Sequence, residues 1–170
     1  MTVRAYLPTT LRLLRQAREH GRFAPAPLAG HAVTPALTAL GEGASEEELE
    51  WAASVAASLD SLRLLAQQAA GAAPGSEEEA AGLRRVVAAV DVAVVEPAPG
   101  DDPSAVVLRE VPLRRLAALL VDAPDAAPLV RAARDALGAG AAEDDPAVER
   151  CLEEDLGWWS ASELDVLLDG

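Results

Sequence analysis

The stretch RRVVAAVDVAVV, residues 84–95, gives the clearest indication of a β-sheet in this chain. Valine and alanine fill both sets of alternating positions, so both faces of an extended segment are apolar, and only Asp91 interrupts them. β-Branched residues favour strands, and a strand with two apolar faces is typical of a sheet covered on both sides. The stretch therefore predicts a central strand with other parts of the chain packed against each face.

A long helix is expected to follow Ser45. Ser45 and Glu48 have the spacing of a capping box, in which each side chain accepts a hydrogen bond from the other residue's backbone N–H. Apolar residues then recur at helical spacing until Gly71, and they are Ala52, Val55, Leu59, Leu62 and Ala66. This pattern predicts a helix of about seven turns.

The other predicted elements are shorter and follow from caps, prolines and alternating apolar residues. Strands are expected at residues 3–7, 31–34, 105–109 and 157–159, the third as the hairpin partner of residues 84–95. Helices are expected at residues 10–20, 35–41, 113–121, 126–137, 146–154 and 161–168. Thr9 or Thr10 can cap the first of them, and Ser160 with Glu163 has the spacing of a second capping box before the last. This order favours an α+β fold in a single domain, residues 1–170, with a mixed four- or five-stranded sheet, helices packed on it, and flexible linkers near 71–82 and 96–104.

The composition removes several kinds of chemistry. Lysine, asparagine and isoleucine do not occur, a pattern that a high-GC genome explains through their AT-rich codons. Without lysine there is no Schiff base and no phosphate-loop lysine, and without asparagine there is no Cys/His/Asn triad. With two histidines and one cysteine, the chain offers few catalytic groups, and we expect a protein without catalysis of its own.

The charge distribution bears on partners and location. The net charge is −14, and residues 143–170 hold ten acids against one arginine. Such a surface repels phosphate backbones and anionic lipids, so neither nucleic acid nor a membrane is expected as a partner. The single cysteine, Cys151, forbids an internal disulfide, and the sequence shows neither a signal peptide nor a membrane-spanning apolar run. We expect a cytoplasmic protein.

Five residues are candidates for a small-molecule site near the first strand–helix junction, namely Arg4, Tyr6, Thr9, His31 and Asp91. A helix that begins at Thr9 presents free N–H groups to an anion, although simple N-capping explains the same hydroxyl. Asp91 interrupts the valine strand, where we expect its carboxyl to be buried, so it requires either a raised pKa or a partner such as Arg84, Arg85 or Arg4. Perturbed acids gather at functional sites. A structural ion pair accounts for Asp91 equally well.

Two further groups are candidates for binding a protein partner. Arg12, Arg15 and Arg18 fall on one side of the first predicted helix. This face binds an anionic ligand or an acidic partner surface, or else it is solvated or paired with the chain's own acidic C-terminal block. Trp158 and Trp159 are adjacent on a predicted strand and must point to opposite faces. One is expected in the core and the other to anchor a partner, unless the chain's own helices cover both.

No metal site and no cofactor are expected. His20 and His31 lack the spacing of zinc ligands with each other and with Cys151. Cys151 lies among glutamates, which raise the pKa of a thiol rather than lowering it. Motifs for phosphate loops, dinucleotide loops and nucleophile elbows do not occur.

Several segments carry a resemblance to a known family. They are VRAYLPTTLRLLRQ, HAVTPAL, EELEWAA, RRVVAAVDV and LGWWSASELDVLL. Together they resemble a family of short uncharacterised actinobacterial proteins, a domain of unknown function. The resemblance covers most of the chain and implies an intact domain, but no activity, cofactor or catalytic residue.

Two functional hypotheses remain open from the sequence. The first is a non-catalytic interaction or accessory domain that forms a homodimer or binds a protein partner through an exposed aromatic residue or strand edge. The second is a small-molecule-binding domain or metal-independent enzyme, with a pocket where the first strand and helix meet the central strand. Convergence of Tyr6, His31 and Asp91 on one concave pocket would favour the second hypothesis. Their separation and burial by packing would count against it.

Overall fold

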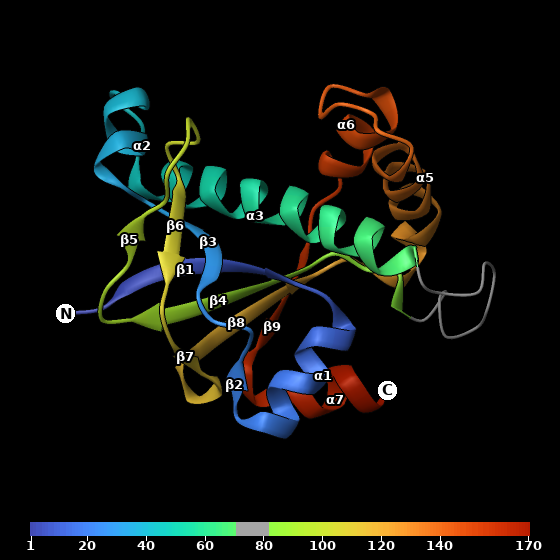
Figure 1. The fold of residues 1–170 in the computed structure, drawn as a ribbon, viewed down its shortest axis with the longest axis horizontal. Coiled ribbons are helices and arrows are strands. Elements are labelled where there is room, and N and C mark those ends of the chain that lie inside the picture. The colour runs from blue at the N-terminus through green and yellow to red at the C-terminus, as the bar shows by residue number, and fades with distance from the viewer. Residues whose placement is uncertain (71–81) are drawn as a thin grey trace.

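The computed structural model describes residues 1–70 and 82–170. A seven-stranded sheet lies at its centre, every pairing in it is antiparallel, and the strand order is β5-β6-β3-β1-β4-β8-β9 (Figure 1). The strands are β1 (Val3–Thr9), β3 (Leu28–Ala32), β4 (Val86–Val92), β5 (Glu96–Pro97), β6 (Ala105–Leu108), β8 (Leu116–Val121) and β9 (Gly157–Ser160). A two-stranded sheet joins β2 (Arg22–Phe23) to β7 (Val111–Pro112).

Helices cover both faces of the large sheet. Within residues 1–70 and 82–170 they are α1 (Leu11–His20), α2 (Pro35–Leu40), α3 (Glu46–Ala69), α5 (Ala127–Gly138), α6 (Pro146–Leu152) and α7 (Leu164–Asp169). The long α3 crosses one face, while α1 and α7 pack together on the other (Figure 1). Against the far side of α3, α5 and α6 form a second apolar cluster. The α+β class predicted from the sequence is confirmed.

The central strand is where the sequence places it. β4 pairs with β1 along one edge and with β8 along the other. On one face Val86 packs in the core that includes Leu14 of α1 and Leu167 of α7. On the other face Val87 packs in the cluster that includes Ala57 of α3. The prediction of a strand covered on both sides is confirmed.

The predicted helix caps are also present. The Leu13 N–H donates to Oγ1 of Thr10 at 3.2 Å, and α1 ends at Gly21, whose φ of 69° is left-handed and suits glycine. Ser45 and Glu48 form a reciprocal capping box at the start of α3. Leu59 and Leu62 of the predicted apolar stripe of α3 are buried. The buried face of α3 is wider than this stripe, because the helix packs against both the sheet and α5.

Two features of the sheet differ from the prediction. It has seven strands rather than four or five, and its pairings are all antiparallel rather than mixed. The helix predicted at residues 113–121 is wrong, because Leu116–Val121 forms β8 after a single 3₁₀ turn at Leu113–Arg115. A short apolar run has no periodicity that separates strand from helix, and here the free edge of β4 determines the outcome.

The predicted hairpin between β4 and residues 105–109 is also wrong. β6 lies between β3 and β5, because β1 and β8 already occupy both edges of β4. Part of the linker predicted near 96–104 is ordered as β5, which pairs with β6. The linker predicted near 71–82 lies outside the described residues except for Gly82.

A buried ion pair joins the residue before β4 to the residue after β8. The side chains of Arg85 and Asp122 are each 1% exposed, and they make two hydrogen bonds of 2.9 and 2.7 Å with each other. The Arg85 N–H also donates to Asp122, and its guanidinium donates to the carbonyl of Glu154 at 2.9 Å. The pair therefore ties three segments together at one end of the sheet.

Among the residues that the structure describes, no helix is both long enough and apolar enough to cross a membrane.

Candidate functional site

The sheet opens between β1 and β3. These strands pair only at Ala5 with Ala32 and at Tyr6 with His31. Beyond that point β1 continues to Thr9 and stays paired with β4, while β3 stays paired with β6. The two strands therefore diverge and leave a gap inside the sheet.

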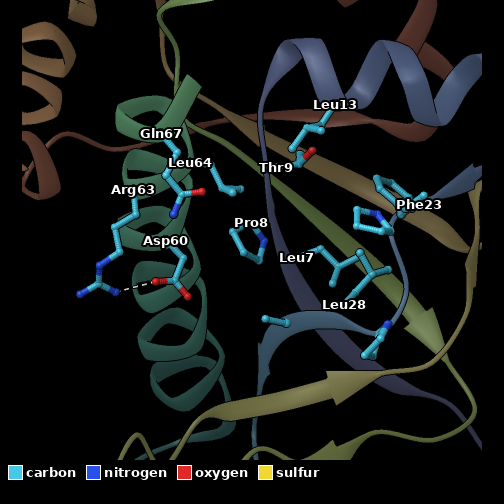
Figure 2. Close-up of a pocket in the computed structure, with 14 residues that line it drawn as sticks. Leu7, Pro8, Thr9, Leu13, Phe23, Leu28, Asp60, Arg63, Leu64 and Gln67 are labelled. Atoms are coloured by element: carbon cyan, nitrogen blue, oxygen red, sulfur yellow. Dashed lines mark hydrogen bonds and ion pairs between the residues drawn. The ribbon is translucent and has the colours of Figure 1, made fainter. Parts of the chain in front are cut away.

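A cavity of about 310 Å³ occupies this gap, and we call it the β1–β3 cavity. Figure 2 shows its apolar lining, to which five elements contribute Leu7, Leu13, Phe23, Leu28 and Leu64. The volume lies at the lower end of the range of ligand pockets, roughly 300–1,000 Å³. A mainly apolar lining with a few polar groups is typical of small-molecule sites.

Backbone groups line the same gap. The Ala32 N–H donates at 2.9 Å to the carbonyl of Ser104, the residue before β6, so the backbone groups of Ala32 are directed toward β6. Because successive residues of a strand direct their backbone groups to opposite edges, those of His31 and Ala29 are directed toward β1. Tyr6 pairs with His31 on the edge of β1 that faces β3. Pro8 lies two residues further along β1, so its carbonyl is directed to the same edge. The register gives Pro8 and Ala29 no strand partner across the gap, so their backbone groups are available to a ligand.

A polar network borders the cavity. Asp60 of α3 accepts a hydrogen bond from Arg63 at 2.6 Å and lies 2.9 Å from Nε2 of His31. The other ring nitrogen, Nδ1, lies 2.9 Å from Oγ of Ser104, which donates to Asp102 at 2.7 Å. Both nitrogens of the buried His31 ring are therefore occupied, and the ring links β3 to α3 and to the loop before β6.

The charge state of Asp60 follows from these contacts. Burial of the Asp60 carboxyl raises its pKa, but the hydrogen bonds from His31 and Arg63 outweigh burial and hold the pKa below its usual value. Asp60 is therefore ionised at neutral pH.

The order Ser104–His31–Asp60 has the connectivity of a nucleophile, a base and a carboxylate. Ser104, however, is 3% exposed, and its hydroxyl hydrogen is directed to Asp102. It lines neither the β1–β3 cavity nor the adjoining hollow around His31. The arrangement therefore fixes the imidazole ring and does not present a nucleophile.

The adjoining hollow lies on the other side of Asp60. It has a volume of about 260 Å³, and we call it the His31 hollow. Its polar lining consists of His31, Asp60, Arg63, Asp102 and Glu143. Asp60 and Arg63 also line the β1–β3 cavity, so this ion pair forms part of the wall of both spaces. In the described part of the chain, no three metal-binding side chains are grouped so that they could hold an ion.

A protein-family model matches residues 3–168 of the chain. The chain belongs to DUF6912, a family of unknown function. This match confirms the resemblance to a family of unknown function, whereas the restriction of DUF6912 to actinobacteria stays a prediction. The chain matches no curated protein and no solved structure.

The residues predicted for a ligand site in this DUF6912 protein do not converge, and Tyr6, His31 and Asp91 do not share a pocket, so the site is not where the sequence predicted it. Thr9 lies in the wall of the β1–β3 cavity, and His31 lies behind Asp60 in the polar network. Tyr6 is opposite His31 in the ladder but packs beneath α3, where burial raises its pKa to about 12. Its side chain lines neither space.

Arg4 and Asp91 lie at the other end of β1. They face each other across β1 and β4 and make two hydrogen bonds of 2.9 Å. The expectation that Asp91 is buried is wrong, since its side chain is 37% exposed near the end of β4. The hydrogen bond from Arg4 holds the Asp91 pKa below its usual value, so Asp91 is an ion-paired surface acid.

The basic side chains of α1 partly meet the acidic C-terminal segment. Arg18 contacts Asp165 and Asp169 of α7, while Arg15 donates to a backbone carbonyl of α7. Arg12 is exposed on the same helix. For Arg18, the structure therefore shows the alternative in which the chain's own acidic C-terminal block pairs with the arginines of this helix.

The two tryptophans of β9 behave differently from each other. Trp159 packs against the core beside α1 and α7, whereas Trp158 is 66% exposed. β9 is the last strand of the sheet and pairs only with β8 in the described chain. Trp158 therefore stands exposed on an edge strand, where the sequence places a candidate anchor.

Sequence reasoning missed the residues that form most of the cavity. In the sequence, Asp60 and Arg63 have the pattern of ordinary charged residues of an amphipathic helix. Their role depends on His31, which β3 places beside Asp60. Asp60 is the only acid between Glu50 and the end of α3, which is one signal that the sequence carries. Pro8 within β1 is a second signal, because proline favours strand edges without a partner.

Proposed function

We propose that this DUF6912 protein is a small-molecule-binding domain whose site is the β1–β3 cavity. The observation that carries the proposal is the divergence of β1 and β3, which leaves an apolar cavity of about 310 Å³ with free backbone hydrogen-bonding groups. Ligand pockets combine an apolar wall with a few placed polar groups, and here Asp60, Gln67 and the Pro8 carbonyl supply them.

A thermal-shift screen of a metabolite library tests the proposal. A ligand present at about 100 times its Kd stabilises the folded state by about 2.7 kcal/mol. For a domain of this size that corresponds to a rise in Tm of roughly 5–11 °C. Ala29→Leu places a larger side chain in the cavity wall and should abolish the shift, whereas Ala36→Leu on the exposed surface of α2 should retain it. Equal shifts in both variants would contradict the proposal.

A second candidate function is self-association through the β9 edge, and the exposure of Trp158 favours it. An unpaired edge strand offers backbone groups to a second copy, and an exposed tryptophan supplies apolar contact area. Light scattering should then report a dimer for the wild type and a monomer for Trp158→Ser. A monomeric wild type would exclude this function.

A further inference from the structure

We infer that the ligand of the β1–β3 cavity carries an ammonium group on a compact apolar body, and that the ammonium binds Asp60. The inference rests on the proposed function and specifies the chemistry of the same site.

The cavity offers acceptors where a cation would lie. A carboxylate has about four acceptor positions, and Asp60 uses one on each oxygen, for Arg63 and for His31. Its side chain is 29% exposed, so the remaining positions are accessible. The carbonyls of Pro8 and Ala29 add two acceptors on the gap, against one backbone donor, the Ala29 N–H, because Pro8 has no N–H.

The one arginine in the lining does not offer a site for an anion. Arg63 contacts Asp60 at 2.6 Å through one nitrogen and Glu143 through another. Its guanidinium is therefore shared between two carboxylates. Figure 2 shows it on the far side of Asp60 from Leu7 and Leu28, so that a molecule in the cavity meets the carboxylate first.

The balance of charge around the polar network is negative. Asp60, Asp102 and Glu143 supply three carboxylates, against Arg63 and the imidazole of His31. Even with His31 protonated, the group carries one net negative charge. A cation that enters the cavity offsets this charge, whereas a carboxylate adds to it and is repelled.

The apolar lining defines the rest of the ligand. Leu7, Leu13, Phe23, Leu28 and Leu64 present hydrocarbon surface from five elements, and the volume of about 310 Å³ admits a compact ring or a short chain. Three probes of similar shape separate the charge of the head group from the apolar body. They are cyclohexylmethylammonium, cyclohexylmethanol and cyclohexanecarboxylate.

Titration of the full chain with each probe, followed by NMR chemical shifts, tests the inference. Cyclohexylmethylammonium should bind about tenfold or more tightly than the alcohol, because its hydrogen bond to Asp60 is charge-assisted. Asp60→Asn should remove that preference. Asp91→Asn, which removes a carboxylate from an arginine pair outside the cavity, should leave it unchanged. Circular dichroism checks that each variant is folded.

Ala29→Leu keeps Asp60 but fills part of the cavity, so it should weaken the binding of every probe. This variant therefore tests whether the probes bind in the cavity, independently of their charge. Equal or tighter binding of the alcohol or the carboxylate at the cavity would overturn the ammonium assignment and leave the proposed function standing. Failure of all three probes, together with a metabolite screen without a hit, would overturn the proposed function as well.

Discussion

Replacement of Asp122 by alanine should destabilise the fold much more than the loss of an exposed, ion-paired aspartate. Asp122 accepts three hydrogen bonds from Arg85, two from the guanidinium and one from the backbone N–H, at 2.7 to 2.9 Å. Both side chains are 1% exposed. In the variant the guanidinium keeps the Glu154 carbonyl as a partner but has no counter-charge.

The expected magnitude follows from this burial. Breaking a buried ion pair by removing one partner costs about 3–5 kcal/mol, because an uncompensated charge remains in the interior. A domain of this size loses about 2–4 °C of Tm per kcal/mol, so the Tm should fall by roughly 6–20 °C. Asp91→Ala is the matched control, since it breaks an aspartate–arginine pair of the same geometry whose side chains are 37% and 42% exposed. Exposed pairs contribute about 0–1 kcal/mol, which predicts a Tm change below about 4 °C.

Urea unfolding followed by circular dichroism measures both free energies, and thermal melts measure both values of Tm. The double variant Arg85→Met, Asp122→Leu should recover much of the loss, because an apolar pair leaves no buried charge. If Asp122→Ala and Asp91→Ala cost the same, or if Asp122→Ala costs less than about 1 kcal/mol, the assignment of a buried pair to Arg85 and Asp122 is refuted.

Three further predictions concern single residues. Cys151 is fully buried and burial raises its pKa to about 11, so a thiol reagent should react only after unfolding; rapid reaction of the native protein would contradict this. Ser45→Ala should lower the free energy of unfolding by about 1 kcal/mol in urea titrations, because the reciprocal cap of α3 is lost; no change would mean that the cap does not stabilise α3. The folded pKa of Asp60 lies below its unfolded value near 3.8, so its stabilisation is complete above that pH and is lost as the pH falls through the folded pKa. Acid unfolding should therefore depend less on pH in Asp60→Asn than in the wild type, and identical slopes would exclude the Asp60 contacts with His31 and Arg63.

Local chemistry predicted the parts of the fold that depend on neighbours in sequence. The caps at Thr10, Ser45 and Ser160 need only residues three positions apart, and all three form. The strand β4 was predictable because its valines alternate over a long stretch, whereas β8 was mistaken for a helix because six apolar residues have no distinct period.

The candidate site depends on pairings that are distant in sequence, which limits what the sequence reveals. Asp60 and His31 meet where the end of β3 pairs with β1 for two residues, while β3 from Leu28 to His31 pairs with β6. That register is set by the whole sheet and not by the residues near His31. For Asp91 the sequence indicated an arginine partner correctly, but its exposure depends on where β4 ends.

The most direct test of a ligand site between β1 and β3 is the location of chemical-shift changes when a stabilising compound is added to the isotope-labelled chain. The account predicts that the largest changes fall on Leu7, Thr9, Ala29 and Leu64 in the cavity wall. Changes confined to β9 around Trp158, with the cavity residues unaffected, would contradict it.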